Sequence, residues 1–264
     1  MDFQKLRKYD RMYLQCPEFE SSGLVKHAFT TCLGGVSHGK IDGLNLGFRV
    51  GDHAESVQKN YQYIAQDLNL NYNNMVLSRQ THTDNIRIVT KDDAGKGLIK
   101  DSDIFDTDGL VTDLPDIPLV IFSADCTPIL LLDIKKKVVG AVHAGWRGTV
   151  KQIAAKAIKT MIRSFGSNAA DILAAIGPSI GPCCFETEWD TAKHFLSDFV
   201  SGKENEKFFV NLWAANQKQL MECGVLARNI FLAQECTKCH SDIYYSYRAQ
   251  REKAGRMAAI ISLI

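Results

Sequence analysis

Residues 118–143 read PLVIFSADCTPILLLDIKKKVVGAVH, and this stretch decides the fold. It contains three apolar runs with short polar breaks between them, at 118–123, 128–133 and 138–143. Each run has the length of a β-strand and is apolar almost throughout, which is typical of strands buried on both faces. We therefore expect three core strands that are covered by helices.

Helical and strand patterns alternate on either side of this stretch. Residues 150–165 carry apolar side chains at helical spacing, and Gly166 follows as a helix stop. Further helices are predicted over 55–68, 187–200 and 212–223, and further strands over 75–79, 86–90, 171–176, 208–212, 229–233 and 243–247. The polar stretch 201–207 is interpreted as a surface loop. The pattern predicts an α/β (α+β) fold with mixed sheets covered by helices, and one domain over residues 1–264.

Composition and charge restrict the class of protein. The 264 residues include 31 basic and 30 acidic side chains, which gives a net charge of +1. Such a balance exerts no long-range attraction on nucleic acid or an anionic membrane, so neither is expected as a partner. No apolar stretch reaches the length of a membrane span or resembles a signal peptide. Eight cysteines without an export signal are expected to be reduced, and the predicted location is the cytoplasm.

Three segments place a reactive side chain where a predicted strand meets a turn. His82 follows the strand at 75–79, Cys126 lies in the SADC break, and His143 ends a strand. Two imidazoles and a thiolate suit zinc and leave a fourth position for water or substrate; copper is the alternative metal. Without metal, the same residues suit a thiolate nucleophile with a histidine base. The competing interpretation is a pair of structural histidines and an inert buried cysteine.

The segment that follows His143 has features of an anion site. Gly145 and Gly148 allow close approach of the backbone, and a helix begins here. Arg147 is suited to bidentate phosphate binding, and Trp146 either stacks on a purine or belongs to the core. Arg49, which lies between two glycines, is either a second phosphate ligand or a surface ion-pair partner.

A second cysteine motif occurs late in the chain. Cys236-Thr-Lys-Cys239-His240 matches the attachment pattern of c-type haem, which belongs to exported proteins. As half of a structural zinc site it requires a second pair, and Cys183-Cys184 are adjacent rather than spaced. The sequence therefore gives this motif no metal or redox role.

Eight segments, in order, resemble the signatures of the laccase-domain (polyphenol oxidase) family. They are FTTCLGGVS (29–37), LNLGFRVGD (44–52), RQTHTDNI (79–86), DTDGLVTD (106–113), SADCTPILLLD (123–133), GAVHAGWRGTV (140–150), AIGPSIGPCCFE (175–186) and YYSYRAQREKAGRMA (244–258). The resemblance implies a fold related to the catalytic domain of cytotoxic necrotising factor toxins. It also implies zinc held by His82, Cys126 and His143, phosphorolysis of adenosine, inosine and 5'-methylthioadenosine, and deamination of adenosine. The older family name implies copper-dependent polyphenol oxidation.

On this basis we predict a purine nucleoside phosphorylase with adenosine deaminase activity. The predicted substrate and phosphate ligands are Arg49, Gln80, Arg147 and Arg248, and Asp84 or Asp125 is suggested as the proton carrier. The chain departs from the family pattern at 249–252, which puts ligand contacts from that loop in doubt. The alternatives are a cysteine hydrolase or amidase acting on cell-wall precursors, a copper oxidase and a non-catalytic binding module. The seven histidines form no HxH pair, which argues against a multi-copper cluster.

Overall fold

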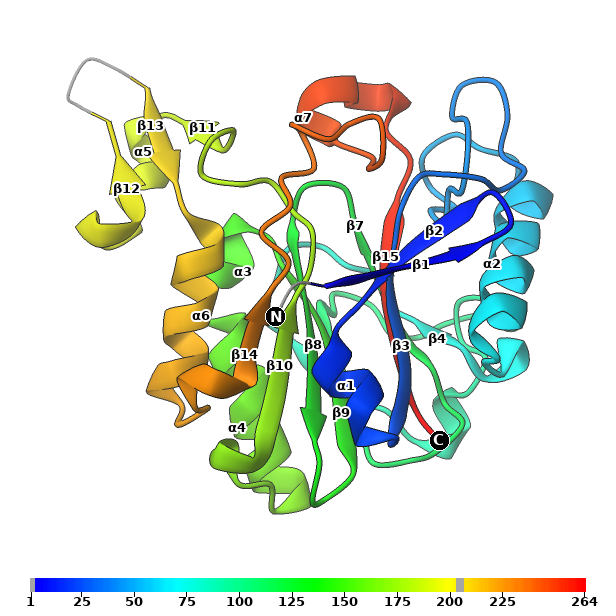
Figure 1. Ribbon diagram of the computed structural model, residues 1–264, viewed down its shortest axis with the longest axis horizontal. Coiled ribbons are helices and arrows are strands. Elements are labelled where there is room, and N and C mark those ends of the chain that lie inside the picture. The colour runs from blue at the N-terminus through cyan, green and yellow to red at the C-terminus, as the bar shows by residue number, and fades with distance from the viewer. Residues whose placement is uncertain (1–2, 203–206) are drawn as a thin grey trace.

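Two stacked β-sheets form the centre of the molecule in the computed structural model, which describes residues 3–202 and 207–264 (Figure 1). The first sheet has the strand order β1-β2-β3-β15-β7-β4. Its strands are β1 (Gln4–Lys8), β2 (Arg11–Gln15), β3 (Val25–Thr30), β15 (Met257–Leu263), β7 (Leu119–Ser123) and β4 (Val76–Leu77). All neighbours are antiparallel except β4 and β7.

The second sheet has the strand order β14-β10-β8-β9-β6-β5. Its strands are β14 (Ile230–Leu232), β10 (Ile172–Ile176), β8 (Thr127–Asp133), β9 (Val138–Ala144), β6 (Gly109–Thr112) and β5 (Ile86–Ile88). The pairs β10–β14 and β5–β6 are parallel and the rest antiparallel, so the predicted mixed arrangement is confirmed. A small third sheet contains β11 (Glu186–Thr187), β13 (Phe208–Val210) and β12 (Val200–Ser201).

The alternation of side chains along each strand divides the core into layers. Leu119 and Ile121 of β7 point into the cluster between the two sheets, where they meet residues such as Leu130 of β8. Val120, between them, packs on the opposite face with Tyr61 of α2. The apolar runs are thus buried on both faces, as expected. The expectation that helices cover both faces is wrong, because the inner face of each sheet lies against the other sheet.

The longer helices cover the two outer faces (Figure 1). α2 (Ala54–Leu68) packs on the first sheet, and α4 (Ile153–Phe165) packs on the second beside α6 (Leu212–Glu222). Shorter helices are α1 (Pro17–Ser22), α3 (Trp146–Val150), α5 (Trp189–Ala192) and α7 (Tyr247–Gln250). The helix predicted over 150–165 begins only at Ile153, because Gln152 adopts a left-handed conformation with φ 61° that separates α4 from α3. Its predicted end at Gly166 is confirmed.

Two predicted elements are wrong. The helix expected over 187–200 is limited to α5, because the chain then turns into β12, which pairs with β13. The strand expected over 243–247 is a loop, in which Tyr244 and Tyr245 are buried but donate their hydroxyl hydrogen bonds to Glu235 and to the carbonyl of Asp42. Of the predicted loop at 201–207, residues 203–206 lie outside the described residues.

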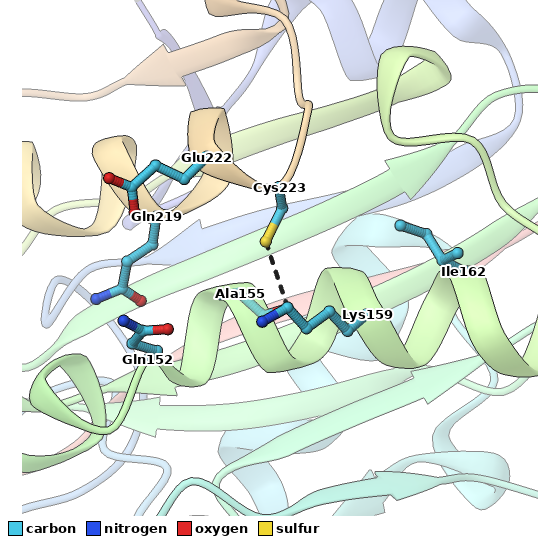
Figure 2. A pocket seen from close by; sticks show the side chains of 7 residues that line it. All are labelled: Gln152, Ala155, Lys159, Ile162, Gln219, Glu222 and Cys223. Carbon is cyan, nitrogen blue, oxygen red and sulfur yellow. Dashed lines mark hydrogen bonds between the residues drawn. The ribbon is translucent and has the colours of Figure 1, made fainter.

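A groove of about 200 Å³ lies between α4 and α6 on the outer helical layer (Figure 2). Cys223 points into it and donates to the carbonyl of Ala155 at 3.8 Å. Burial raises the pKa of this thiol, as expected for a packing residue. None of the helices in the described ranges is both apolar enough and long enough to span a bilayer.

Candidate active site and metal centre

His82, Cys126 and His143 come together in space. Each offers a nitrogen or sulfur atom, and these atoms all lie within 4.8 Å of one another. His82 is in the loop after β4, Cys126 is in the turn between β7 and β8, and His143 is in β9. The turn that contains Cys126 connects the two sheets, so stacking the sheets brings the three segments to one end of the sandwich.

A buried carboxylate, Asp108, supports His82, Cys126 and His143, which are called the trio below. From the sequence alone this aspartate had no assigned role. Asp108 is fully buried immediately before β6, and its Oδ1 lies 2.7 Å from Nδ1 of His143. The pairing of β6 with β9 places the two residues side by side, and the backbone N–H of His143 donates to the carbonyl of Asp108. Asp108 therefore orients the imidazole and leaves Nε2 free to face Cys126. The segment DTDGLVTD was the only sequence signal for it.

Asp108 also holds the loop that carries His82. Its carboxylate accepts hydrogen bonds from the backbone N–H groups of Thr81, His82 and Thr83, and from the Thr83 hydroxyl. His82 adopts φ 63°, a conformation that is uncommon for a residue other than glycine. The four hydrogen bonds to Asp108 hold the loop in this conformation and so bring the imidazole close to Cys126 and His143.

Gly145 gives the trio its space. A Cβ atom at this position would lie 2.8 Å from Cδ2 of His82 and 3.1 Å from Sγ of Cys126. Both distances are shorter than ordinary carbon contacts. The sequence suggested that this glycine lets the backbone approach a ligand, whereas its closest neighbours here are the metal-capable side chains themselves.

The electrostatics of the site favour a thiolate beside an imidazolium. Burial by itself raises the pKa of Cys126, but the charge of His143 and hydrogen bonds from both histidines lower it to about 6. For His143, burial opposes the charged form, while Cys126 and Asp108 raise its pKa to about 9. Burial also raises the pKa of Asp108, yet the interactions with His143 and the loop N–H groups bring it to about 2.

These shifts predict how the metal-free protein reacts with iodoacetamide. Because the thiolate is the nucleophile, the alkylation rate of Cys126 in the folded protein should rise with pH with a midpoint of about 6. In denatured protein the midpoint should be near 9. Burial raises the pKa of Cys16 and Cys32, which should react more slowly at neutral pH. Peptide mass spectrometry over a pH series measures each rate. A native midpoint for Cys126 near 9 would exclude the ion pair.

A large cavity opens at the trio. Its volume is about 1520 Å³, and its wall includes His82, Cys126 and His143 together with polar and aromatic side chains. Four arginines reach it: Arg49, Arg79, Arg248 and the half-buried Arg256. The aromatic side chains on its wall are Phe48, Phe105, Phe122, Trp146, Phe185 and Tyr247. Phe105 and Tyr247 are about half exposed, which is typical of side chains at the mouth of a binding site.

Two of the predicted substrate ligands have other partners. Gln80 lines the cavity, but its amide donates to the carbonyl of Phe122 at 2.9 Å and accepts from the N–H of the same residue at 2.6 Å. These two hydrogen bonds attach the loop that contains Gln80 and His82 to β7. Arg147 is not brought to the cavity wall: it is exposed, and its guanidinium carbon lies 4.2 Å from the ring centre of Trp146.

The suggested proton carriers are also engaged elsewhere. Asp84 forms an ion pair with Lys156 of α4, on the outer layer of the molecule. Asp125 lies on the cavity wall, but its two oxygens accept from the Thr237 hydroxyl and from the backbone N–H of Arg248, each at 2.7 Å. Asp84 is therefore engaged by a lysine away from the cavity, and Asp125 holds Thr237 and the backbone of Arg248 in place.

Known proteins resemble this chain over nearly its full length. The family model described as multi-copper polyphenol oxidoreductase laccase matches residues 26–264. A Bacillus subtilis (strain 168) protein named purine nucleoside phosphorylase YlmD is 35% identical over 242 residues, 89% of this chain and 87% of that protein. A protein from an unknown prokaryotic organism named adenosine deaminase RL5 is 34% identical and covers 90% of this chain and 94% of its own length.

The solved structures agree with this relationship. The hypothetical protein YfiH of Bacillus licheniformis matches with a TM-score of 0.92 and 33% identity over 99% of each chain. YlmD from Geobacillus stearothermophilus matches with a TM-score of 0.91 and 30% identity over 99% of this chain and 98% of that one. Family model, relatives and fold all confirm the resemblance inferred from the eight sequence segments, and the chain belongs to the laccase-like polyphenol oxidase family.

Proposed function

We propose that this protein is a purine nucleoside phosphorylase that also deaminates adenosine, with zinc held by His82, Cys126 and His143. The observation that carries the proposal is the convergence of these three ligand atoms on the wall of a cavity that also presents arginines and aromatic rings. The names of the relatives support it, since one is called a phosphorylase and another an adenosine deaminase. Adenosine, inosine and 5'-methylthioadenosine are the proposed substrates.

The donor set fits zinc. Two imidazole nitrogens and one thiolate form a three-ligand set that leaves one position open, and the carboxylate of Asp108 behind His143 is the usual partner of a zinc-bound histidine. When bound, zinc supplies a water molecule of lowered pKa for attack on the purine ring in deamination.

The arginines provide the phosphate pocket. Arg248 is held in place by its backbone hydrogen bond to Asp125 and by a side-chain hydrogen bond to the carbonyl of Glu186 at 2.9 Å. Arg49 lies on the same cavity wall and is exposed, so its guanidinium is available to an anion. The pKa of Arg256 is lowered, because the effect of burial outweighs the opposing effect of the negative charge on nearby Cys126. We assign phosphate to Arg49 and Arg248, and the purine to the aromatic side chains at the cavity mouth.

A cysteine hydrolase is the second candidate. In this mechanism Cys126, whose thiol pKa is lowered, is the nucleophile, His143 is the base, and Asp108 is the carboxylate that orients the base. That mechanism gives His82 no function, although the structure holds its backbone in an uncommon conformation beside the other two. A His82→Ala protein should lose its bound zinc and phosphorolysis, whereas a thiol hydrolase would keep its activity.

Copper oxidation is less well supported. Within residues 3–202 and 207–264, only two histidines take part in any group of three or more metal-capable side chains. A trinuclear copper cluster needs many imidazoles close together. A single copper ion in place of zinc is the form of this alternative that the residues allow.

The deciding experiment measures hypoxanthine release from inosine with and without phosphate, on protein of known metal content. We expect release that requires both phosphate and zinc, because the anion is the proposed nucleophile. Chelated protein, reconstituted with zinc, serves as the control. Equal release without phosphate would refute phosphorolysis, and undiminished activity after chelation would favour the thiol hydrolase. Ammonia release from adenosine tests the deaminase, and it should require zinc but not phosphate, because water is the nucleophile.

A further inference from the structure

Four cysteines outside the candidate active site form a second cluster. The sulfur atoms of Cys183, Cys184, Cys236 and Cys239 all lie within 4.8 Å of one another. Cys183 and Cys184 belong to the loop after β10, and the other two belong to the loop after β14. β10 and β14 are parallel neighbours, so their carboxyl ends bring both loops to the same edge of the second sheet. The structure thus supplies the second pair that the sequence interpretation found missing.

The distances between the sulfur atoms suit a shared metal ion. Sγ of Cys239 lies 3.6 Å from Sγ of Cys183 and 3.5 Å from Sγ of Cys184. Four thiolates arranged tetrahedrally around zinc at about 2.3 Å have sulfur atoms about 3.8 Å apart. A disulfide requires about 2.05 Å, and all four cysteines are free.

The backbone around the cluster has the features of a metal-binding turn. The N–H of Gly181 donates to Sγ of Cys236 at 3.2 Å, and such a bond stabilises a thiolate. Ser179 and Cys236 form a parallel bridge that joins the two loops. Cys236 is buried, while Cys183 and Cys239 are exposed, so the cluster sits at the surface with one ligand anchored below it.

We propose that Cys183, Cys184, Cys236 and Cys239 bind a structural zinc ion that locks the two loops together. This site is distinct from the trio and does not depend on the proposed function. Zinc is the metal that four thiolates at tetrahedral spacing most commonly hold in a closed site. Four thiolates this close repel one another, and a divalent cation removes that repulsion.

The zinc ion would also support the large cavity. Thr237, inside the Cys236–Cys239 turn, donates to Asp125, which in turn accepts from the N–H of Arg248. The N–H of Ile180, in the other loop, donates to the carbonyl of Asp125 at 2.8 Å. Both loops of the cluster therefore contact the residue that precedes Cys126.

Metal analysis of protein purified without oxygen tests the proposal. We expect the Cys183→Ser/Cys239→Ser double variant to contain one zinc ion fewer per chain than the unmodified protein. Cys223→Ser, which changes a cysteine in the groove between α4 and α6, is the matched control and should lose none. An unchanged zinc content in the folded double variant would overturn the proposal.

A second measurement does not require the double variant to fold. In Cys126→Ala protein, which lacks the thiolate of the trio, X-ray absorption at the zinc edge should show four sulfur neighbours at about 2.3 Å. Nitrogen or oxygen neighbours, or no zinc in this folded protein, would overturn the four-cysteine site. The result is independent of nucleoside turnover, so it is distinguishable from any failure of the phosphorylase proposal.

Discussion

Replacing Cys126 with alanine is expected to lower phosphate-dependent release of hypoxanthine from inosine by at least about 100-fold, with loss of the zinc at the trio. The thiolate is the only anionic member of the proposed ligand set, and without it two imidazoles would have to hold the metal alone. Alanine also removes the negative charge that raises the pKa of His143. The measurement is the initial rate at saturating phosphate, together with zinc content per chain.

The control for this variant is Cys223→Ala. That thiol lies between α4 and α6, where it contacts only the carbonyl of Ala155 among its hydrogen-bond acceptors in the described chain (Figure 2). Its removal should leave turnover unchanged and, because the thiol is half-buried, should lower the melting temperature only slightly. Full activity in folded Cys126→Ala protein would remove the trio from the mechanism.

Changing Asp108 to asparagine is expected to weaken zinc binding by about 10–100-fold and to destabilise the fold by about 3 kcal/mol. In the native protein Oδ1 accepts from His82 and His143, while Oδ2 accepts from Thr81 and Thr83. In asparagine an NH₂ group replaces one of the two carboxylate oxygens. Because NH₂ cannot accept a hydrogen bond, the donors that faced that oxygen are left without a partner in a buried site. Zinc competition and urea denaturation measure the two effects.

The pH dependence of this loss has a defined sign. Folding lowers the pKa of Asp108 from 3.8 to about 2, so its stabilising contribution is complete above pH 3.8 and disappears as the pH falls toward 2. The difference in unfolding free energy between the native protein and Asp108→Asn should therefore shrink over that interval. Asp106→Asn is the matched control, since Asp106 is exposed and accepts a side-chain hydrogen bond from Thr81. A similar loss in both variants would contradict the positioning role.

Some strands were predictable from local composition, and others that are equally apolar were not. The runs that became β7, β8 and β9 were identified within a residue or two, because local composition alone indicates burial. β15 was missed, although it lies in the middle of the first sheet between β3 and β7. Its place depends on pairing with distant segments, and no local pattern encodes that pairing. The stacking of one sheet on the other was not predictable either. A strand face that packs against a helix and one that packs against a sheet are both apolar, so composition does not distinguish them.

The candidate metal ligands were predictable from motif positions, but the residues that support them were not. The structure brings His82, Cys126 and His143 together as expected, because each follows or ends a recognisable strand. The role of Asp108 arises from the pairing of β6 with β9, which composition does not reveal. The four-cysteine cluster was dismissed because Cys183 and Cys184 are adjacent in sequence; only the parallel pairing of β10 with β14 makes them partners of the CxxC turn.

The place of β15 has a consequence for biosynthesis. Until residues 257–263 have left the ribosome, β3 and β7 have no strand between them, and the first sheet exists as two separate pieces. Their apolar edges are then open to other nascent chains, which favours aggregation during translation. The large cavity, whose wall includes Arg256 immediately before β15, can be completed only after translation has passed this strand.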